Sequence, residues 1–255
     1  MKRILTIAII IIFFGACRKE KPDVPIVKIP QGALNLVSTY QLEILEPSGI
    51  SFGPNKQSLL IVSDNSNMVY ETNLKGEINR TLNYVGSDLE GVVYNLDENI
   101  VAVVEERKRE IVLLDYDSGN EISNHNINVE IGNENKGLEG LSYNINNKAY
   151  YIVNEDLPGE LIVWNTNFDI IERTELKFAD DYSAIFVDSR NSLLWILSDE
   201  SQTLYKCNYK AEVIMEFTMP STKYEGIILD VDLMKAYFVN DATARLEVYD
   251  VVIDN

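Results

Sequence analysis

The 255-residue sequence predicts an all-β fold, a five-bladed β-propeller, on three observations. A short start motif recurs five times at intervals of 42 to 49 residues, and repeats of about 40–50 residues with several strands each are typical of propellers. Apolar and alternating strand-like segments follow every start motif. One further strand-like segment precedes the first motif. The motifs occupy residues 47–50, 89–92, 138–141, 182–185 and 224–227.

Residues 1–16 predict an export signal. A basic start, an uncharged apolar run of about 7–15 residues and small residues before the cleavage point define a secretory signal, and such a run is too short to span a bilayer. The Gly15-Ala16-Cys17 sequence resembles a bacterial lipobox, although Phe14 stands where that motif prefers Leu. We therefore expect lipid on Cys17, export, and a cell-envelope location at the outer membrane or the periplasmic face. A plain signal peptide and an uncleaved anchor are the alternatives.

Residues 17–32 are interpreted as a tether between the lipid and the folded part. Three prolines and mixed charges favour an extended chain over a helix. If Cys17 carries lipid, the remaining cysteine, Cys207, has no disulfide partner and is expected to be a buried structural thiol. A catalytic cysteine is not expected, because the only histidine, His125, lies in a polar segment.

Residues 33–255 are expected to form the propeller domain. In each repeat the second strand is a continuous apolar run, as expected for a strand buried on both faces, and the fourth is the most polar. This gradient fits a blade that runs from an inner channel to an outer rim. The last repeat ends after three strands, so we expect residues 33–40 to supply its outer strand and thereby close the ring. A sixth, irregular blade is the alternative, but no sixth start motif occurs.

Ten polar or acidic positions are expected at one mouth of the ring. Antiparallel pairing places the start of strand one beside the end of strand two, and the two positions are 15 to 17 residues apart in every repeat. A nearly constant separation predicts nearly the same geometry in each blade. The strand-one starts carry Ser48, Glu90, Glu139, Ser183 and Glu225, and the strand-two ends carry Asp64, Glu105, Glu155, Glu200 and Asp241.

Carboxylates gathered in this way raise one another's pKa or recruit a cation. Oxygen ligands suit Ca²⁺, which takes about 6–8 of them, and no set of His or Cys residues suits zinc or copper. We expect a Ca²⁺ site held by Glu90, Glu139 and Glu155, with Glu105 as the next ligand. The other positions of the mouth would surround it. The alternative is that the glutamates cap strand ends by accepting hydrogen bonds from backbone N–H groups.

Four motifs resemble those of the SdiA-regulated, YjiK-like family of bacterial propeller proteins, which is distantly related to NHL-repeat proteins. They read EPSGI at 46–50, SDLEGV at 87–92, KGLEGL at 136–141 with VNE at 153–155, and LSDES at 197–201. The resemblance extends from about residue 36 to 250. It implies a five-bladed propeller with a calcium site in the channel region, and it implies no settled activity.

The composition of the chain and the motifs that it lacks exclude several classes of function. A net charge of −18 excludes binding of nucleic acid through a phosphate-neutralising surface. No Gly-x-Ser-x-Gly elbow or Gly-rich phosphate loop occurs. One remaining class is a non-enzymatic, membrane-anchored module that presents a Ca²⁺-stabilised face to a small molecule, glycan or protein. The other is a metal-dependent hydrolase of lactones or phosphoesters, with Glu105 or Glu200 as base. We favour the binding module.

Overall fold

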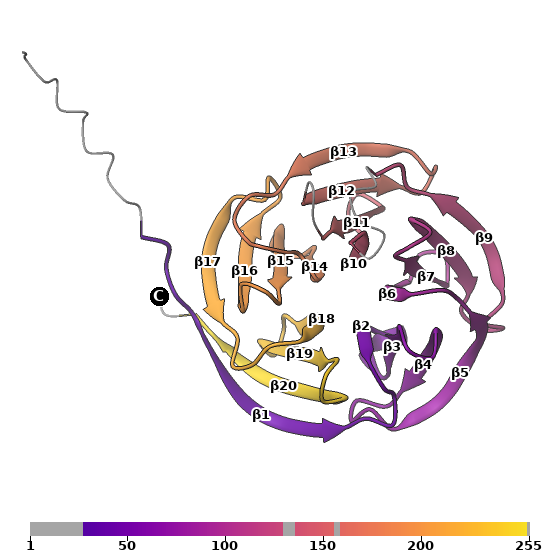
Figure 1. The fold of residues 1–255 in the computed structure, drawn as a ribbon, viewed down its shortest axis with the longest axis horizontal. Coiled ribbons are helices and arrows are strands. Elements are labelled where there is room, and N and C mark those ends of the chain that lie inside the picture. Colours follow the sequence, from indigo (N-terminus) through magenta and orange to yellow (C-terminus); the bar gives the residue numbers. More distant parts are fainter. Residues whose placement is uncertain (1–27, 130–135, 156–158, 254–255) are drawn as a thin grey trace, which may run out of the picture.

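The structure, a computed structural model, describes residues 28–129, 136–155 and 159–253 and confirms the predicted fold. Five four-stranded antiparallel sheets stand around a common axis as the blades of a propeller (Figure 1). Within these described ranges the chain has one short 3-10 helix, Pro54–Lys56, and no helix long and apolar enough to cross a membrane. Residues 1–27 lie outside the described ranges, so the export signal and the lipidation of Cys17 stay predictions.

Each blade is a meander of strands that follow one another from the axis to the rim. Blade 1 contains β2 (Pro47–Phe52), β3 (Leu59–Ser63), β4 (Met68–Thr72) and β5 (Ile78–Val85). Blade 2 contains β6 (Leu89–Asn95), β7 (Ile100–Glu105), β8 (Glu110–Asp115) and β9 (Glu121–Asn126). Blade 3 contains β10 (Leu138–Asn144), β11 (Ala149–Asn154), β12 (Glu160–Asn165) and β13 (Ile170–Glu175). Blade 4 contains β14 (Ala184–Asp188), β15 (Leu193–Ser198), β16 (Thr203–Asn208) and β17 (Val213–Thr218).

The two ends of the propeller chain join in blade 5. Its inner strands are β18 (Tyr224–Asp230), β19 (Lys235–Asn240) and β20 (Arg245–Val252), and its outer strand is β1 (Ala33–Gln41). β1 pairs antiparallel with β20 along its whole length, as Figure 1 shows at the rim of the ring. The prediction that the N-terminal segment closes the last blade is confirmed. This pairing holds the ring shut, because it ties the first strand of the fold to the last.

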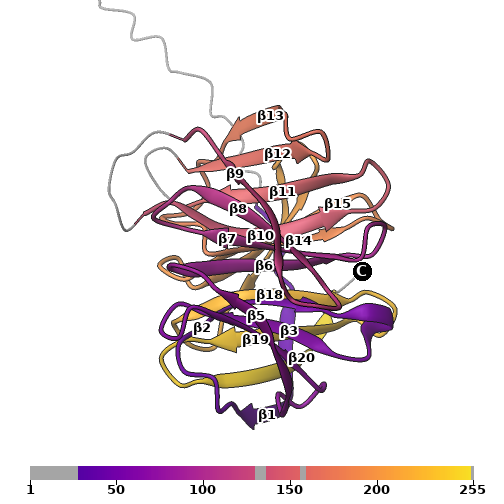
Figure 2. The ribbon, with the colours of Figure 1, turned by 90° about the vertical axis from the view of Figure 1, so that its right-hand side faces the viewer.

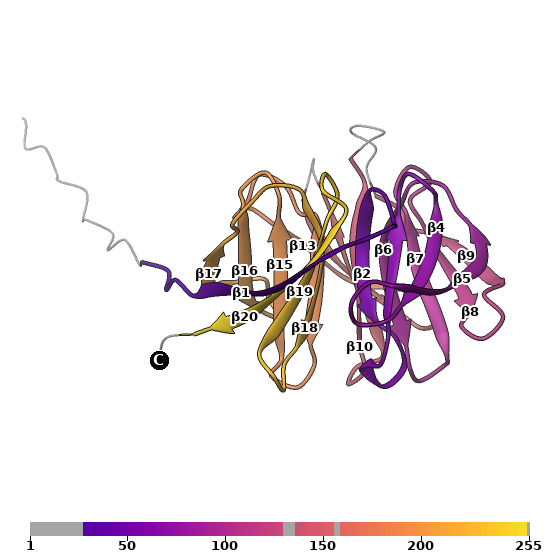
Figure 3. The same ribbon diagram turned by 90° about the horizontal axis from the view of Figure 1, so that it is seen from below.

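Burial falls from the inside of each blade to its rim. The second strands β3 and β11 are buried at every position, whereas the outer strands β9 and β13 are mostly exposed. The hydrophobic core is divided into five clusters, each of which lies between two neighbouring blades. Figures 2 and 3 show the ring from two sides, with inner strands such as β6 running along the axis. The core therefore holds blade to blade and leaves the axis itself free for a site.

Small residues let the inner strands approach one another closely at mid-height. A Cβ on Gly140 would lie 2.5 Å from the backbone nitrogen of Ile185 and 2.6 Å from the Cα of Ala184. A Cβ on Gly91 would lie 2.5 Å from the carbonyl oxygen of Glu139. Glycine is the residue that permits such a close backbone approach within a strand. The space left at the axis is about 10 Å³, room for at most one water molecule, so the channel is closed at this level.

The thiol of Cys207 is fully buried between blades 3 and 4, as predicted. Burial raises its pKa to about 12, so it stays protonated and unreactive at neutral pH. His125 lies on the outer strand β9 and stacks on the ring of Phe168, with 3.7 Å between the ring centroids. Neither residue reaches the axis of the propeller.

Candidate metal site

β-Bulges at the starts of the inner strands set the direction in which the acidic side chains there point. In blades 1, 2, 3 and 5 the register between the first and second strand shifts at the start motif. A bulge places two residues opposite one and re-aims the side chain at that point. Glu90, Glu139 and Glu225 occupy these shifts and line a cavity at the axis. Blade 4 has no such shift, and Ser183 stands at the corresponding position.

The residue that follows the second strand is acidic in every blade and lines the same cavity. These five residues are Asp64, Glu106, Glu155, Asp199 and Asp241. The cavity, which we call the acidic mouth, has a volume of about 290 Å³. Its lining consists of Asp64, Glu90, Glu106, Glu139, Glu155, Asp181, Ser183, Asp199, Glu200, Lys223, Glu225 and Asp241. The predicted acidic cluster at one mouth of the ring is therefore present, although not every predicted residue belongs to it.

Glu106 lies where two groups of three carboxylates meet. Oxygens of Asp88, Glu90 and Glu106 lie within 4.8 Å of one another, and so do oxygens of Glu106, Glu139 and Glu155. Two oxygens bound to one Ca²⁺ at about 2.3–2.6 Å are at most about 5 Å apart, so either group fits around such an ion. Glu106 is only 5% exposed, and its Oε1 has no hydrogen-bond partner among the described residues. A buried carboxylate oxygen without a partner is costly unless a cation or proton compensates it.

The serines at the strand-one positions donate hydrogen bonds to neighbouring backbone carbonyls, and no described group donates one to the two central glutamates. Ser48 donates to the carbonyl of Leu89 in the next blade, and Ser183 donates to the carbonyl of Tyr224 at 3.3 Å. No hydrogen bond from a described residue reaches the carboxylates of Glu90 and Glu139. These two side chains therefore offer their oxygens to the cavity.

The environment of the acidic mouth raises the pKa of several of its carboxyl groups. Burial is the largest cause, and the neighbouring carboxylates add to it. Together they raise the pKa of Glu90 and of Glu139 well above the ordinary value. Burial, with Asp241 as the next cause, raises the pKa of Glu225 to about 8. Burial, with Asp88 as the next cause, also raises the pKa of Glu106 to about 8. Bound cations would displace protons from these groups.

Two lysines offset a part of the negative charge. Lys223 Nζ lies 3.5 Å from Asp199 Oδ2 and 3.5 Å from Glu225 Oε1. Lys136 Nζ lies 3.4 Å from Glu155 Oε1. Burial, partly offset by this lysine, raises the pKa of Glu155. Two ammonium groups are fewer than the ten carboxyl groups of the lining, so the acidic mouth attracts cations wherever those groups are ionised.

The structure corrects the predicted role of Glu105. This last residue of β7 is fully buried and does not line the acidic mouth. Its Oε1 accepts hydrogen bonds from the Tyr84 hydroxyl at 2.6 Å and from the Ser87 N–H at 2.9 Å, and Lys108 Nζ lies 2.6 Å from its Oε2. Successive side chains alternate in direction at a strand end, so the next residue, Glu106, faces the cavity instead.

The spacing between the two repeated positions identifies Glu106 as the residue that faces the cavity in blade 2. The cavity-lining partners stand 16 residues after the strand-one position in every blade, which selects Glu106 in blade 2 and Asp199 in blade 4. Glu200, the predicted residue in blade 4, also lines the mouth and is more exposed. Asp181 gave no repeat signal, because it lies in the loop before β14, where it accepts the Glu200 N–H at 3.0 Å.

Comparison with known proteins gives the family and the fold. The model of the SdiA-regulated family matches residues 35–229. The chain belongs to the SdiA-regulated family. Among solved structures, this family member is similar to a glutaminyl cyclase of Myxococcus xanthus, with 12% identity, a TM-score of 0.67, and coverage of 89% of this chain and all of that one.

Two lyases share the architecture of this SdiA-regulated protein less closely. A streptogramin B lyase is 12% identical with a TM-score of 0.52, and the match covers 82% of this chain and 71% of the lyase. An inactive H270A virginiamycin B lyase from Staphylococcus aureus, solved with quinupristin, is 17% identical with a TM-score of 0.53, covering 82% and 66%. At these identities the likeness extends to the fold alone.

Proposed function

We propose that this SdiA-regulated protein is a Ca²⁺-binding module of the cell envelope, anchored to a membrane by lipid on Cys17. The observation that carries the calcium part is Glu106. It is buried, one of its oxygens has no partner among the described residues, and it belongs to both groups of three carboxylates. A divalent ion there would satisfy that oxygen and offset the repulsion between the groups.

Three inner-blade carboxylates would complete the binding set. Glu90 and Glu139 reach the cavity from bulged strands of neighbouring blades, and Glu155 reaches it directly after the end of β11. A bound ion would therefore tie blades 2 and 3 together at the axis. The bound Ca²⁺ would supply a fixed positive charge on an otherwise acidic face. That face could then recognise a small molecule, a glycan or a protein through polar groups.

Calorimetric titration of the full chain in a nonionic detergent with CaCl₂ tests the calcium proposal. We expect saturable heat with the wild-type chain and at least about tenfold weaker binding with Glu106→Gln, since the amide keeps the shape and removes the charge. Glu172→Gln is the matched control, because Glu172 is exposed on the outer strand β13. Absence of heat and of a thermal shift with the wild-type chain would refute the proposal.

The anchor part of the proposal rests on the sequence and agrees with the course of the chain. β1 begins at the outer rim of blade 5, away from the axis (Figure 1). A tether that leaves from the rim keeps both mouths accessible. Replacement Cys17→Ser should move the protein from the membrane fraction to the soluble fraction with an unchanged thermal transition. A protein that stays in the membrane fraction would contradict lipidation at this residue.

A second candidate function is a metal-dependent hydrolase, which the size of the acidic mouth favours. About 290 Å³ exceeds the space of one ion and leaves room for a bound ester. Glu105 cannot be the base, because it is buried and bonded elsewhere. Glu200 remains, since its side chain is 55% exposed at the cavity. A screen of lactones and phosphoesters, with and without a chelator, tests this, and chelator-sensitive turnover that Glu200→Gln abolishes is the expected result.

A further inference from the structure

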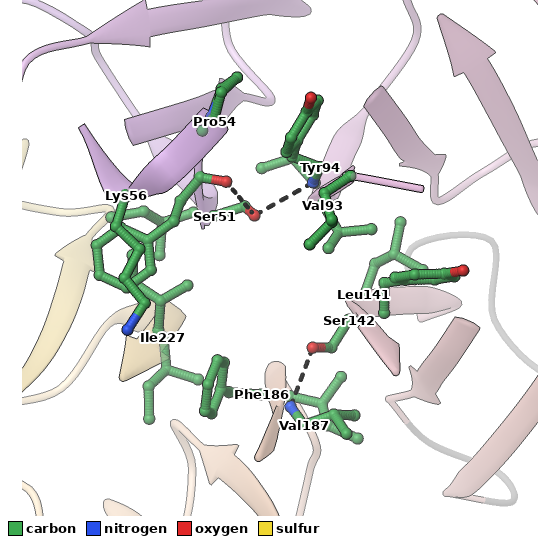
Figure 4. A pocket seen from close by; sticks show the side chains of 18 of the residues that line it. Ser51, Pro54, Lys56, Val93, Tyr94, Leu141, Ser142, Phe186, Val187 and Ile227 are labelled. Atoms are coloured by element: carbon green, nitrogen blue, oxygen red, sulfur yellow. Dashed lines mark hydrogen bonds between the residues drawn. The ribbon is translucent and has the colours of Figure 1, made fainter. Parts of the chain in front are cut away.

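The opposite end of the axis holds a second cavity, which we call the apolar mouth. It has a volume of about 440 Å³, within the range of roughly 300–1,000 Å³ that ligand pockets occupy. Figure 4 shows side chains from all five inner strands around an open centre. The acidic mouth is lined by the starts of these strands, and the apolar mouth by their later residues and by the turn at Pro54–Lys56. Prominent members of its lining are Ile50, Phe52, Tyr94, Leu141, Phe186 and Ile227.

The apolar mouth is a blind pocket. The close approach of the inner strands at Gly91 and Gly140 leaves about 10 Å³ between the two mouths. The two mouths have no lining residue in common. A ligand in the apolar mouth would therefore rest on a floor formed by Ile50, Val92 and Leu141, which line both the narrow space and the pocket. An ion bound in the acidic mouth would not contact it.

The charge balance of the apolar mouth indicates an uncharged ligand. Among the described residues that line it, Lys56 is the only charged one. Its ammonium group already lies 2.9 Å from Asp230 and 3.4 Å from Asp232 at the rim. An anionic ligand would compete with these two carboxylates, and a cationic one would find no counter-charge within the lining. Leu96 also lines the cavity and is 60% exposed.

Ser51 on β2 and Ser142 on β10 occupy equivalent positions of their blades, but only the hydroxyl of Ser51 donates a hydrogen bond to a described residue. Ser51 Oγ accepts the N–H of Tyr94 at 3.3 Å, and Ser142 Oγ accepts the N–H of Val187 at 3.0 Å, each from the next blade along the chain. The Ser51 hydroxyl donates to the Phe52 carbonyl at 3.2 Å. The Ser142 hydroxyl has no acceptor among the described residues, although the residue is 6% exposed. Figure 4 shows both hydroxyls at the wall of the cavity. One donor is therefore spare in a mainly apolar pocket.

We propose that the apolar mouth binds a small, uncharged and mainly apolar molecule with a ring system, which accepts a hydrogen bond from Ser142 through a carbonyl or ether oxygen. The aromatic side chains of Phe52 and Phe186 would contact the rings. This site is separate from the calcium site and stands if the calcium proposal fails. A recessed, floored cavity fits a small molecule better than a protein surface, which needs a broad contact area.

Methyl NMR of the full chain in lipid nanodiscs tests the proposal with 2-acetylnaphthalene and its hydrocarbon counterpart 2-ethylnaphthalene. We expect saturable shifts in the methyl signals of Ile50, Ile185 and Ile227, which line the pocket. Ile122 and Ile171 are internal controls, because they are exposed on the outer strands β9 and β13. Absence of shifts with both probes overturns the proposal. Equal shifts at the control methyls indicate unspecific partitioning and overturn it as well.

The two serines provide a matched pair of variants. Ser142→Ala should weaken 2-acetylnaphthalene about fivefold, the worth of one hydrogen bond, and change 2-ethylnaphthalene less than about twofold. Ser51→Ala should change neither probe by more than about twofold, since its proton is already donated. Equal loss of both probes in Ser142→Ala contradicts the assigned donor. Concentration-dependent broadening of the lining methyls without a probe would assign this surface to a second copy of the chain instead and overturn the proposal.

Discussion

The two mouths of the propeller are built from the same five strands and have opposite chemistry. On β6 the acidic mouth takes Glu90 and the apolar mouth takes Tyr94, four residues later; on β10 the pair is Glu139 and Tyr143. The acidic mouth concentrates charges that repel one another, and the apolar mouth leaves hydrophobic area open to solvent. Height along the inner strand therefore decides whether a residue contributes to the acidic mouth or to the apolar mouth.

The largest expected effect comes from the floor that separates the mouths. Gly140→Val should lower the free energy of unfolding by about 3 kcal/mol, because the added atoms meet the backbone of Ala184 and Ile185. Chemical denaturation of the full chain in a nonionic detergent measures this. Ala184→Gly, at the same height in blade 4, is the control and should cost about 1 kcal/mol or less. Equal effects of the two variants would mean that the close approach is not maintained in solution.

The second prediction concerns the pH dependence of stability, to which the carboxyl groups of the acidic mouth contribute. Glu106 and Glu225 have a pKa of about 8 in the folded protein against an ordinary value of 4.5. The folded state therefore holds protons that the unfolded chain releases, so metal-free stability should fall as pH rises from 5 to 8. Calcium should remove most of this fall. Denaturation curves at both pH values, with Ca²⁺ or with chelator, measure it, and a metal-free stability that rises with pH would contradict the proposed protonation.

A smaller effect separates two adjacent glutamates. Without metal at pH 8, Glu106→Gln should raise the free energy of unfolding by about 1 kcal/mol, because it removes a buried charge among like charges. Glu105→Gln should lower it by a similar or larger amount, because Glu105 holds Tyr84, Ser87 and Lys108. Thermal or chemical denaturation of the two variants compares them directly. Effects of the same sign would show that one of the two environments is misassigned.

The smallest effect is expected at the rim of the apolar mouth. Leu96→Ser should change stability by less than about 0.5 kcal/mol at any pH between 5 and 8, because the side chain is 60% exposed. The same denaturation series measures it. A large loss would show that Leu96 is covered in the unliganded protein, and the contrast between a charged mouth and a solvent-open apolar mouth would then fail.

Much of the fold was predictable because it repeats. The period of the start motif gave five blades, and the leftover segment 33–40 gave the closing strand, since a sheet edge without a partner is unfavourable. The acidic mouth followed from antiparallel pairing. Glu105 was chosen wrongly because a one-residue shift reverses the direction of a side chain at the end of a strand. The bulge that re-aims Glu90 is not visible in the sequence pattern alone.

The ring, its closure and the collection of acids at one end follow from the amino-acid sequence alone, because strand periodicity and repeat spacing are properties of the chain. Only the tertiary structure decided that Glu106 and not Glu105 faces the axis, that Gly91 and Gly140 close the channel, and that Ser142 has a spare proton. These features depend on atoms contributed by different blades. Their distances are set by how the five sheets pack around the axis, and no spacing within one blade records that packing.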